Sequence, residues 1–311
     1  MRRRHLLALA GGFALPAHAQ KVPRVGFLVA GDAEPSWTLF RKGMADLGYV
    51  EGRSVAFDYR DAGVNPGDID RMAAALVERQ VDVIVAVLSQ AITAARRATS
   101  RIPIVFFGAA PDIGGVNNVA RPEGNVTGVF SPSSTLAGKG LQLFREIKID
   151  TSSFGLLLNA FDPFHVPLQR DVEAAARAER ISTTSFLIKG RDELPAAVEA
   201  MARTGLDCML AQPSLGFDAP AALALRHRLP AISFRREFAE AGGLMTYGAN
   251  QADNMRTVAT YVDRLLKGAR PADLPAQQAS RFELVVNQKT ARALGIALSP
   301  MFLARVDEVV E

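Results

Sequence analysis

Apolar positions along the chain alternate between short continuous runs and stretches with helical spacing. The run at residues 81–88 is apolar at every position but Asp82, which is typical of a strand buried on both faces of a parallel sheet. The first half of the pattern predicts strands at 24–29, 55–59, 81–88, 102–107 and 125–129 and helices at 36–47, 69–77 and 91–98. Because strands alternate with helices, we expect βαβ units with helices on both faces of a parallel sheet.

A second series with the same rhythm follows the first. It predicts helices at 137–147, 167–179, 193–203 and 221–228 and strands at 154–158, 183–188, 207–211 and 230–234. Two such series indicate two similar lobes. The predicted fold class is therefore α/β, with two doubly wound parallel-sheet lobes.

The C-terminal part of the chain is too short for a third lobe. A helical face at 255–266 is followed by Pro271 and Pro275 and by one further strand at 282–287. A lone helix and a lone strand cannot bury their apolar faces by themselves, so each must dock on an existing lobe. The chain then crosses between lobes more than once, and such a multi-strand hinge can close around a ligand.

These crossings divide the chain into discontinuous lobes. We expect an N-terminal lobe of residues 22–129 plus about 249–280, and a C-terminal lobe of residues 130–248 plus about 281–311.

The first residues have the pattern of an export signal. Three arginines at 2–4 precede an apolar stretch at 6–15, and Ala17 and Ala19 supply the small residues that a signal peptidase recognises. The apolar stretch is about half the length that a bilayer core requires. We therefore predict a signal peptide at residues 1–19, cleaved near Gln20, and a periplasmic protein. The Arg3-Arg4 pair partly resembles a twin-arginine signal, but the general secretory route is favoured.

Charge and cysteine content argue against nucleic acid as a partner, against an internal disulfide and against a lipid anchor. Without residues 1–19 the chain loses three arginines and no acidic residue, so its surplus charge falls from +4 to +1. No basic arm or basic-aromatic stripe remains, which argues against nucleic acid. Cys208 is the only cysteine, so neither an internal disulfide nor a lipid anchor after the signal is expected. No later run reaches membrane-spanning length, and we expect a soluble monomer.

The supply of reactive residues argues against an enzyme. Only His165 and His227 remain after the signal, and Cys208 is far from both in sequence, so no metal site is expected. The first strand leads into residues 31–35, Gly-Asp-Ala-Glu-Pro, which lack the glycine pattern of dinucleotide binding. Phosphate-loop and Gly-x-Ser-x-Gly motifs are absent as well. We therefore expect no cofactor and no catalysis, and an exported α/β protein of this kind favours binding.

Nine stretches of the chain carry a family resemblance through their order and spacing: 43–52, 81–85, 101–105, 120–128, 136–139, 226–232, 236–245, 261–268 and 282–287. Together they resemble the ABC-transporter substrate-binding proteins of the tryptophan/tyrosine type. The resemblance implies a type I periplasmic binding protein fold with three crossovers between the lobes and no catalytic activity. It also implies capture of a small molecule in the cleft between the lobes and its delivery to an ABC permease with its ATPase.

The identity of the ligand stays open at this point. An amino acid, aromatic or not, and a related carboxylate are both compatible with the resemblance. Two loops depart from the family pattern, at Ser89-Gln90-Ala91 and at residues 109–112, and both fall where a ligand is expected. A ligand-sensing receptor domain for a membrane signalling partner is the alternative function, because it uses the same fold. An exported enzyme is the third.

The fold class locates the ligand without the family. In open parallel sheets ligands bind beyond the carboxyl ends of the strands, and two facing lobes bring both sets of loops to one cleft. Thirteen residues on these loops and near the hinge are the predicted ligand-binding set: Asp32, Trp37, Ser89, Gln90, Phe107, Asp112, Asn159, Phe161, Asp162, Gln212, Phe217, Arg235 and Tyr247.

Each polar candidate has a binding role and a structural alternative. Ser89 and Gln90 precede a helix, where they could hold a carboxylate with free backbone N–H groups or simply cap the helix. Asp112 could take an ammonium group or satisfy its own turn. Arg235 could clamp a carboxylate or pair with Glu237 or with Asp162.

The aromatic candidates carry the same ambiguity. Phe161, Phe164 and Phe217 could stack on an apolar ligand group or pack between the lobes. Trp37, the only tryptophan, could belong to the core or to the pocket wall.

Overall fold

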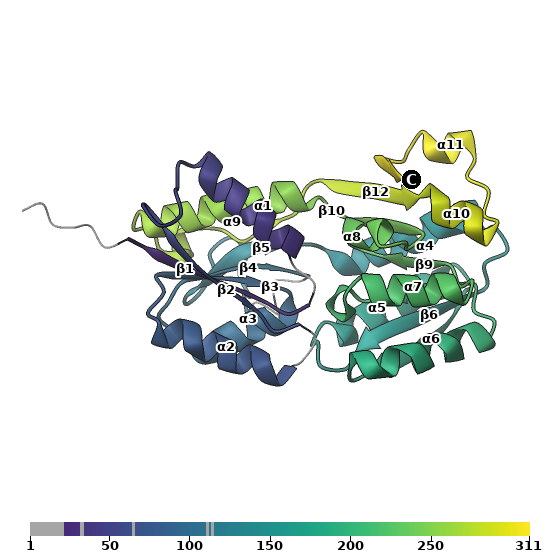
Figure 1. The fold of residues 1–311 in the computed structure, drawn as a ribbon, viewed down its shortest axis with the longest axis horizontal. Helices are drawn as coiled ribbons and strands as arrows, with labels where there is room; N and C mark the ends of the chain where they lie inside the picture. Colours follow the sequence, from purple (N-terminus) through teal and green to yellow (C-terminus); the bar gives the residue numbers. More distant parts are fainter. Residues whose placement is uncertain (1–21, 32–33, 64–65, 110–111, 113–114) are drawn as a thin grey trace, which may run out of the picture.

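The computed structural model describes residues 22–31, 34–63, 66–109, 112 and 115–311. The predicted signal peptide at 1–19 and the candidate Asp32 lie outside the described residues. The described chain forms two α/β lobes side by side (Figure 1). The predicted fold class is therefore confirmed.

The first lobe is built on a six-stranded sheet with the order β11-β5-β4-β3-β1-β2, in which every neighbouring pair is parallel. Its strands are β1 (Arg24–Val29), β2 (Ala56–Asp61), β3 (Val83–Val87), β4 (Ile104–Gly108), β5 (Val126–Phe130) and β11 (Gln277–Gln278). Its helices are α1 (Glu34–Asp46), α2 (Pro66–Glu78), α3 (Ser89–Ala98) and α9 (Gln251–Leu266). All five residues of β3 are buried, because α1 and α9 cover one face of the sheet and α2 and α3 the other.

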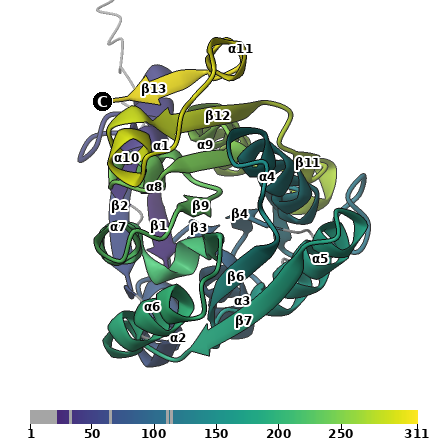
Figure 2. The same ribbon diagram turned by 90° about the vertical axis from the view of Figure 1, so that its right-hand side faces the viewer.

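The second lobe is built on a seven-stranded sheet with the order β13-β12-β10-β9-β8-β6-β7. Its strands are β6 (Ser153–Asn159), β7 (Ser182–Ile188), β8 (Cys208–Ala211), β9 (Ala231–Ser233), β10 (Met245–Ala249), β12 (Phe282–Asn287) and β13 (Glu308–Val310). Its helices are α4 (Ser133–Ile147), α5 (His165–Ala178), α6 (Leu194–Arg203), α7 (Asp218–Arg226), α8 (Arg236–Glu240), α10 (Gln288–Leu294) and α11 (Pro300–Leu303). Figure 2 shows this lobe end-on, with α4 and α5 on one side of the sheet and α6 and α7 on the other.

The described chain passes between the lobes three times, from β5 to α4, from β10 to α9 and from β11 to β12. β12 returns from the first lobe and pairs antiparallel with β10, so this edge of an otherwise parallel sheet is mixed. The sequence pattern predicts β12 but misses β10, whose five residues include Gly248. The lobe boundaries near 129, 249 and 280 stay a prediction.

Helix α9 begins four residues before its predicted start. Asn250 caps it, because its side-chain oxygen accepts a 3.0 Å hydrogen bond from the backbone N–H of Asp253. The helix packs closely on α1, and a Cβ added to Gly43 would lie 2.9 Å from Cβ of Ala259. The absence of a side chain at Gly43 therefore allows the last long helix to dock on the first lobe.

None of the helices in the described ranges is both long enough and apolar enough to cross a membrane.

Candidate functional site

A cavity lies between the two lobes at the carboxyl ends of their parallel strands. Its empty volume is about 560 Å³, part of which is open to solvent. The first lobe contributes Leu88, Ser89, Phe107, Gly108, Ala109 and Ser131, and the second contributes Asp162, Phe164, Pro213, Ser214, Phe234 and Arg235. Ala249, at the end of β10, completes the lining.

The chain topology explains why these residues meet. β3, β4 and β5 end at Val87, Gly108 and Phe130, and the lining residues of the first lobe lie at or directly after these ends. In the second lobe the same holds for β6, β8 and β9. Loops at the carboxyl ends of parallel strands form the usual ligand site of open α/β sheets.

Leu88 carries an unusual backbone conformation at the cavity wall, with φ of 71° and ψ of 156°. This region is almost exclusive to glycine, so the residue is strained. Its N–H donates to the Phe107 carbonyl at 3.0 Å, and its carbonyl accepts from Ile92 at 3.1 Å. The two contacts fix the turn that takes the chain from β3 into α3.

No cap-residue side chain hydrogen-bonds to the first backbone N–H groups of α3, which begins directly after this turn. The cap residue Leu88 makes no side-chain cap hydrogen bond, and Ser89 and Gln90 are both buried in the first turn. The Nε2 atom of Gln90 is buried and has no hydrogen-bond partner among the described residues. Free backbone N–H groups at a helix N-terminus favour an anion. Ser89 lines the cavity, whereas Gln90 is buried but does not line it.

Asp162 is a buried carboxylate on the opposite wall, with 3% of its surface exposed. Its Oδ1 accepts a 3.0 Å hydrogen bond from the N–H of Phe164, and its Oδ2 accepts one of 2.8 Å from Nε2 of Gln212. Burial raises the pKa of Asp162, although hydrogen bonds with Ser214, Phe164 and Gln212 and the charge of His165 oppose the rise. No lysine or arginine in the described part of the chain forms an ion pair with this carboxylate.

Arg235 is the buried cation of the site, with 7% of its surface exposed. Its Nη2 lies 2.6 Å from Oε1 of Glu237, and its Nε lies 3.2 Å from Oε2 of the same carboxylate. Of the two ion-pair partners expected from the sequence, the structure contains Glu237 and not Asp162. Burial alone would raise the pKa of Glu237, but the Arg235 charge and hydrogen bonds outweigh it and hold the pKa below its usual value.

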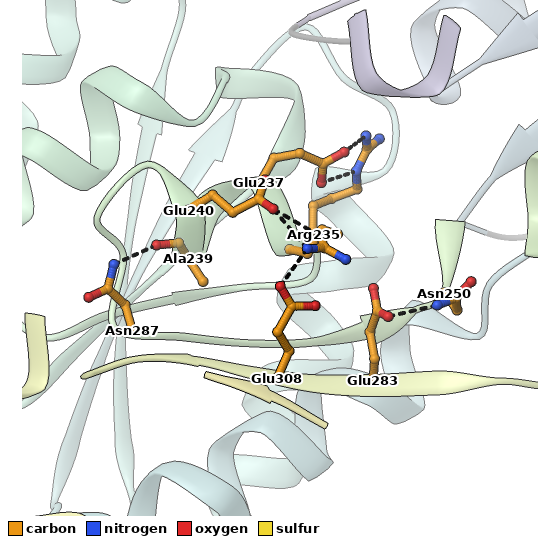
Figure 3. A network of polar contacts seen from close by, with 9 residues as sticks. Arg235, Glu237, Ala239, Glu240, Asn250, Glu283, Asn287 and Glu308 are labelled. Atoms are coloured by element: carbon orange, nitrogen blue, oxygen red, sulfur yellow. Dashed lines mark hydrogen bonds and ion pairs between the residues drawn. The ribbon is translucent and has the colours of Figure 1, made fainter. Parts of the chain in front are cut away.

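The Arg235–Glu237 pair belongs to a wider polar network around α8 (Figure 3). Arg236 donates to Glu240 at 2.9 Å and to Glu308 at 2.7 Å. Asn250, at the crossing into α9, donates to Glu283 on β12 at 2.7 Å. The network ties α8 to the edge strands β12 and β13 and to one of the crossings between the lobes.

The structure brings together part of the predicted ligand-binding set. Ser89, Phe107, Asp162 and Arg235 line the cavity. Four further candidates are buried but do not line the cavity: Gln90, Asn159, Gln212 and Phe217.

The remaining candidates lie elsewhere. Trp37 packs among Phe27, Phe40, Phe57 and Tyr59 in the core of the first lobe. Phe161 and Asp112 are exposed. Tyr247 is half-buried against Phe282, with ring centroids 6.3 Å apart.

Several lining residues are missing from the predicted set. Ser131 and Ala249 lie at two of the crossings between lobes, and Ser214 and Phe234 lie beside candidates that were chosen. Ser214 lies three residues after the predicted strand 207–211 and Phe234 is the last residue of the predicted strand 230–234, so the carboxyl ends of these strands are a signal for both residues. Phe164, expected to stack or to pack, is buried and lines the cavity.

No group of three or more histidine, cysteine, aspartate or glutamate side chains suited to a metal ion occurs among the described residues. Cys208 is buried, and burial raises the pKa of its thiol.

A family model and a curated relative both relate this chain to substrate-binding proteins. The family model of ABC transporter substrate-binding proteins matches residues 29–310. A tyrosine-binding protein from Clostridioides difficile is 21% identical over 266 residues, which cover 82% of this chain and 75% of that protein. That family consists of substrate-binding proteins, not of enzymes.

Two solved structures share the fold over 93% of this chain. A conserved domain protein from Vibrio cholerae is 25% identical, with a TM-score of 0.85 and its whole chain covered. An ABC domain from Streptococcus pneumoniae, solved in complex with L-Trp, is 22% identical, with a TM-score of 0.83 and 99% of its chain covered.

Proposed function

Because this chain belongs to the family of ABC transporter substrate-binding proteins, we propose that it captures a free α-amino acid with an apolar or aromatic side chain between its lobes. The ligand would occupy the cavity that Ser89, Asp162 and Arg235 line. The captured amino acid would then be delivered to an ABC importer.

The proposal rests on the buried carboxylate of Asp162, which forms no ion pair with a lysine or arginine of the described chain. A buried charge without a counter-charge is unstable, and Asp162 has hydrogen-bond donors but no lysine or arginine partner among the described residues. A ligand ammonium group would supply the missing positive charge. Its N–H groups would also use the lone pairs of the carboxylate that Ser214, Phe164 and Gln212 leave free.

The opposite wall suits a carboxylate. Ser89 offers a hydroxyl at the N-terminus of α3, whose first backbone N–H groups are not capped by the side chain of Leu88. The rest of the cavity lining includes the apolar side chains of Phe107, Phe164 and Phe234, which would surround the side chain of the ligand. A zwitterion with an apolar or aromatic side chain matches all three surfaces.

The relatives support the same ligand class. One relative is a tyrosine-binding protein, and one solved structure with this fold is a complex with L-Trp. We therefore expect L-tyrosine and L-tryptophan to be the first ligands to test.

Delivery to an importer fits an exported, freely diffusing receptor. Residues 1–19 would direct export and be removed near Gln20, and the mature chain would act in the periplasm as a monomer. Its partner would be an ABC permease with its ATPase. The hinge formed by three crossings would let the two lobes close on the ligand before delivery.

Binding of matched ligands to the purified protein tests the proposal. L-Tryptophan has both charged groups, whereas indole-3-propionate keeps the ring and the carboxylate but has no ammonium group to pair with Asp162. We expect L-tryptophan at about 100 times its Kd to stabilise the protein by about 2.7 kcal/mol in a thermal melt. Indole-3-propionate at the same concentration should give little shift. Equal shifts with both compounds would contradict the role given to Asp162.

A further inference from the structure

We propose that Arg235 couples occupation of the cavity to closure of the lobes. Its Nη1 would donate a hydrogen bond to a carboxylate oxygen of the ligand. Its Nη2 would at the same time keep its hydrogen bonds to Ser36 and Gln251 of the first lobe. This inference rests on the proposed function, because it requires a ligand with a carboxylate in the cavity.

The guanidinium of Arg235 joins both lobes. Arg235 follows β9 in the second lobe, and its Nη2 donates to Ser36 Oγ of α1 at 3.3 Å and to Gln251 Oε1 of α9 at 2.8 Å. Gln251 also donates to Ser36 at 3.4 Å, and Ser36 is fully buried. Because α1 and α9 pack on the sheet of the first lobe, these contacts form a latch across the boundary between the lobes.

The same guanidinium lines the ligand cavity and has one unused nitrogen. Its Nη1 is buried and finds no hydrogen-bond partner among the described residues. The other nitrogens are committed to Glu237, Ser36 and Gln251. Because Arg235 lines the cavity, an acceptor atom of the ligand is the partner that we assign to this nitrogen.

The surroundings hold Arg235 in place. Glu237 binds it through two oxygens, and the Arg235 Cζ atom lies 5.4 Å from the ring centroid of Phe217. The guanidinium plane is therefore held on both its edge and its face. A group fixed in this way loses little freedom when it binds a ligand, which favours its use as a receptor for a carboxylate.

Closure and ligand binding are linked through this unsatisfied nitrogen. When the lobes separate, water can reach Nη1; when they close, the nitrogen is buried and loses that partner. A buried donor without an acceptor opposes closure, and a ligand carboxylate removes the opposition. The ligand therefore shifts the population toward the closed form by interacting better with Arg235 in that form.

A purely structural ion pair predicts a different outcome. If Arg235 only stabilises the fold, its removal weakens the binding of all ligands alike, whether or not they carry a carboxylate. If Arg235 recognises the carboxylate, its removal affects L-tryptophan much more than tryptamine, which lacks that group.

The experiment combines affinity with the distance between the lobes. Spin labels on Ala74→Cys in α2 and Ala196→Cys in α6 report the distance, since both residues are exposed and the native Cys208 is buried. The helices α2 and α6 lie on the side of the molecule opposite the crossing strands β10 and β12, where hinge closure moves them most (Figure 1). L-Tryptophan and tryptamine are the probes.

Three variants and the unmodified protein are compared. Arg235→Gln combined with Glu237→Gln removes the guanidinium without leaving a buried carboxylate unpaired. Ser36→Ala weakens the latch but keeps Arg235. Arg145→Gln is the control, because it breaks the ion pair with Glu179 inside the second lobe, far from the cavity lining.

We expect the double variant to lose about tenfold to a hundredfold in affinity for L-tryptophan, the range for one charge-assisted hydrogen bond. Its affinity for tryptamine should change by less than about threefold. Ser36→Ala should weaken both probes by the same small factor, less than about threefold, and reduce the short-distance population with L-tryptophan. Arg145→Gln should match the unmodified protein.

Two outcomes would overturn the coupling role of Arg235. Only the second would also overturn the proposed function. If the unmodified protein binds L-tryptophan but the double variant loses both probes equally, or closes as fully as the unmodified protein, only the coupling role of Arg235 is lost. If the folded unmodified protein binds neither probe nor L-tyrosine, the proposed function fails and this inference fails with it.

Discussion

The side-chain amide of Gln212 donates a 2.8 Å hydrogen bond to Oδ2 of Asp162, and both side chains are buried. The amide is oriented by a second contact, because its Oε1 accepts from the backbone N–H of Asn159 at 2.9 Å. Nε2 must then face the carboxylate. Gln212 therefore fixes the direction in which Asp162 presents its charge to the cavity.

Replacement of Asp162 by asparagine should reduce affinity for amino acids by about tenfold to a hundredfold, because the ligand ammonium loses a charged acceptor. Without ligand, the change removes a buried charge that has no lysine or arginine partner among the described residues, but it also replaces one of the two oxygens that accept from Phe164 and Gln212 by an NH2 group. Stability should therefore fall by no more than about 1–3 kcal/mol, the cost of one unpaired buried donor. Calorimetric titration with L-tyrosine measures the first effect and thermal melts the second. Asp171→Asn, which alters a surface pair with Arg170 on α5, should leave affinity unchanged. Retained affinity in Asp162→Asn would refute the assignment.

Ligand binding should weaken in acid. Burial raises the pKa of Asp162, and a ligand ammonium favours the ionised carboxylate, so binding lowers this pKa and releases a proton. Affinity for L-tyrosine should therefore fall as the pH falls through the raised pKa of the ligand-free protein. His165 is the titratable neighbour whose charge acts on Asp162, and Arg235 lines the same cavity.

Titrations in two buffers of different ionisation enthalpy detect the proton release. The release should disappear in Asp162→Asn and persist in His165→Gln. An affinity that stays constant from pH 7 to the acid limit of folding would contradict the role of the carboxylate. The folding stability of the ligand-free protein has the opposite pH dependence from ligand affinity. Because the pKa of Asp162 is raised in the folded state, the stability that its protonated form contributes is lost as the pH rises through that folded pKa.

The start of β6 depends on Asp207. Its Oδ2 accepts hydrogen bonds from the backbone N–H groups of Ser152 at 2.8 Å and Ser153 at 3.0 Å, and its Oδ1 contacts Lys148. Burial would raise the pKa of Asp207, but the contact with Lys148 and these hydrogen bonds lower it well below its usual range. Asp207→Asn should cost about 1–3 kcal/mol in the free energy of unfolding.

Urea unfolding at several pH values checks this effect and its sign. Because the folded pKa is lowered, the stabilisation is complete above about pH 4, the ordinary pKa of an aspartate, and is lost as the pH falls toward the folded value. Asp70→Asn is the control, since its pair with Arg97 is exposed and should contribute about 0.5 kcal/mol or less. Equal losses in the two variants would argue against the special role of Asp207.

Gly248 is required where β10 passes close to the cavity wall. A Cβ at this position would lie 1.6 Å from the carbonyl oxygen of Phe234, a backbone atom that cannot move without displacing β9. Gly248→Ala should destabilise the protein by about 2 kcal/mol or more and weaken ligand binding. Gly140→Ala, in the interior of α4 with its nearest neighbour at 3.8 Å, should instead stabilise by about 0.5–1 kcal/mol. Thermal melts of both variants separate the two effects.

The sequence predicts the parallel strands well because burial on both faces leaves a direct signal. The apolar run at 81–88 contains β3, and the lining residues at its end follow from the topology. The antiparallel partner β10 gives no such signal, because two of its five residues are only half-buried and Gly248 interrupts the apolar pattern. Its partner β12 is separated from it by two crossings between the lobes.

Side-chain roles are harder to predict than strand positions. Trp37 could have faced the cavity or the core, and the contacts with Phe27 and Phe57 that hold it in the core come from β1 and β2. The partner of Arg235 was equally open in sequence, and the local backbone at the start of α8 brings Glu237 to it. Ser131 and Ala249 line the cavity because of how the lobes are hinged, which no local pattern encodes.

Calorimetric titration of the purified protein with L-tyrosine and L-tryptophan tests the central claim most directly. We predict binding of one molecule per chain with a Kd below about 10 µM, or about −7 kcal/mol, for at least one of the two. A folded protein that gives no binding heat and no thermal shift with either amino acid at millimolar concentration would contradict the assignment of the cavity to an amino acid.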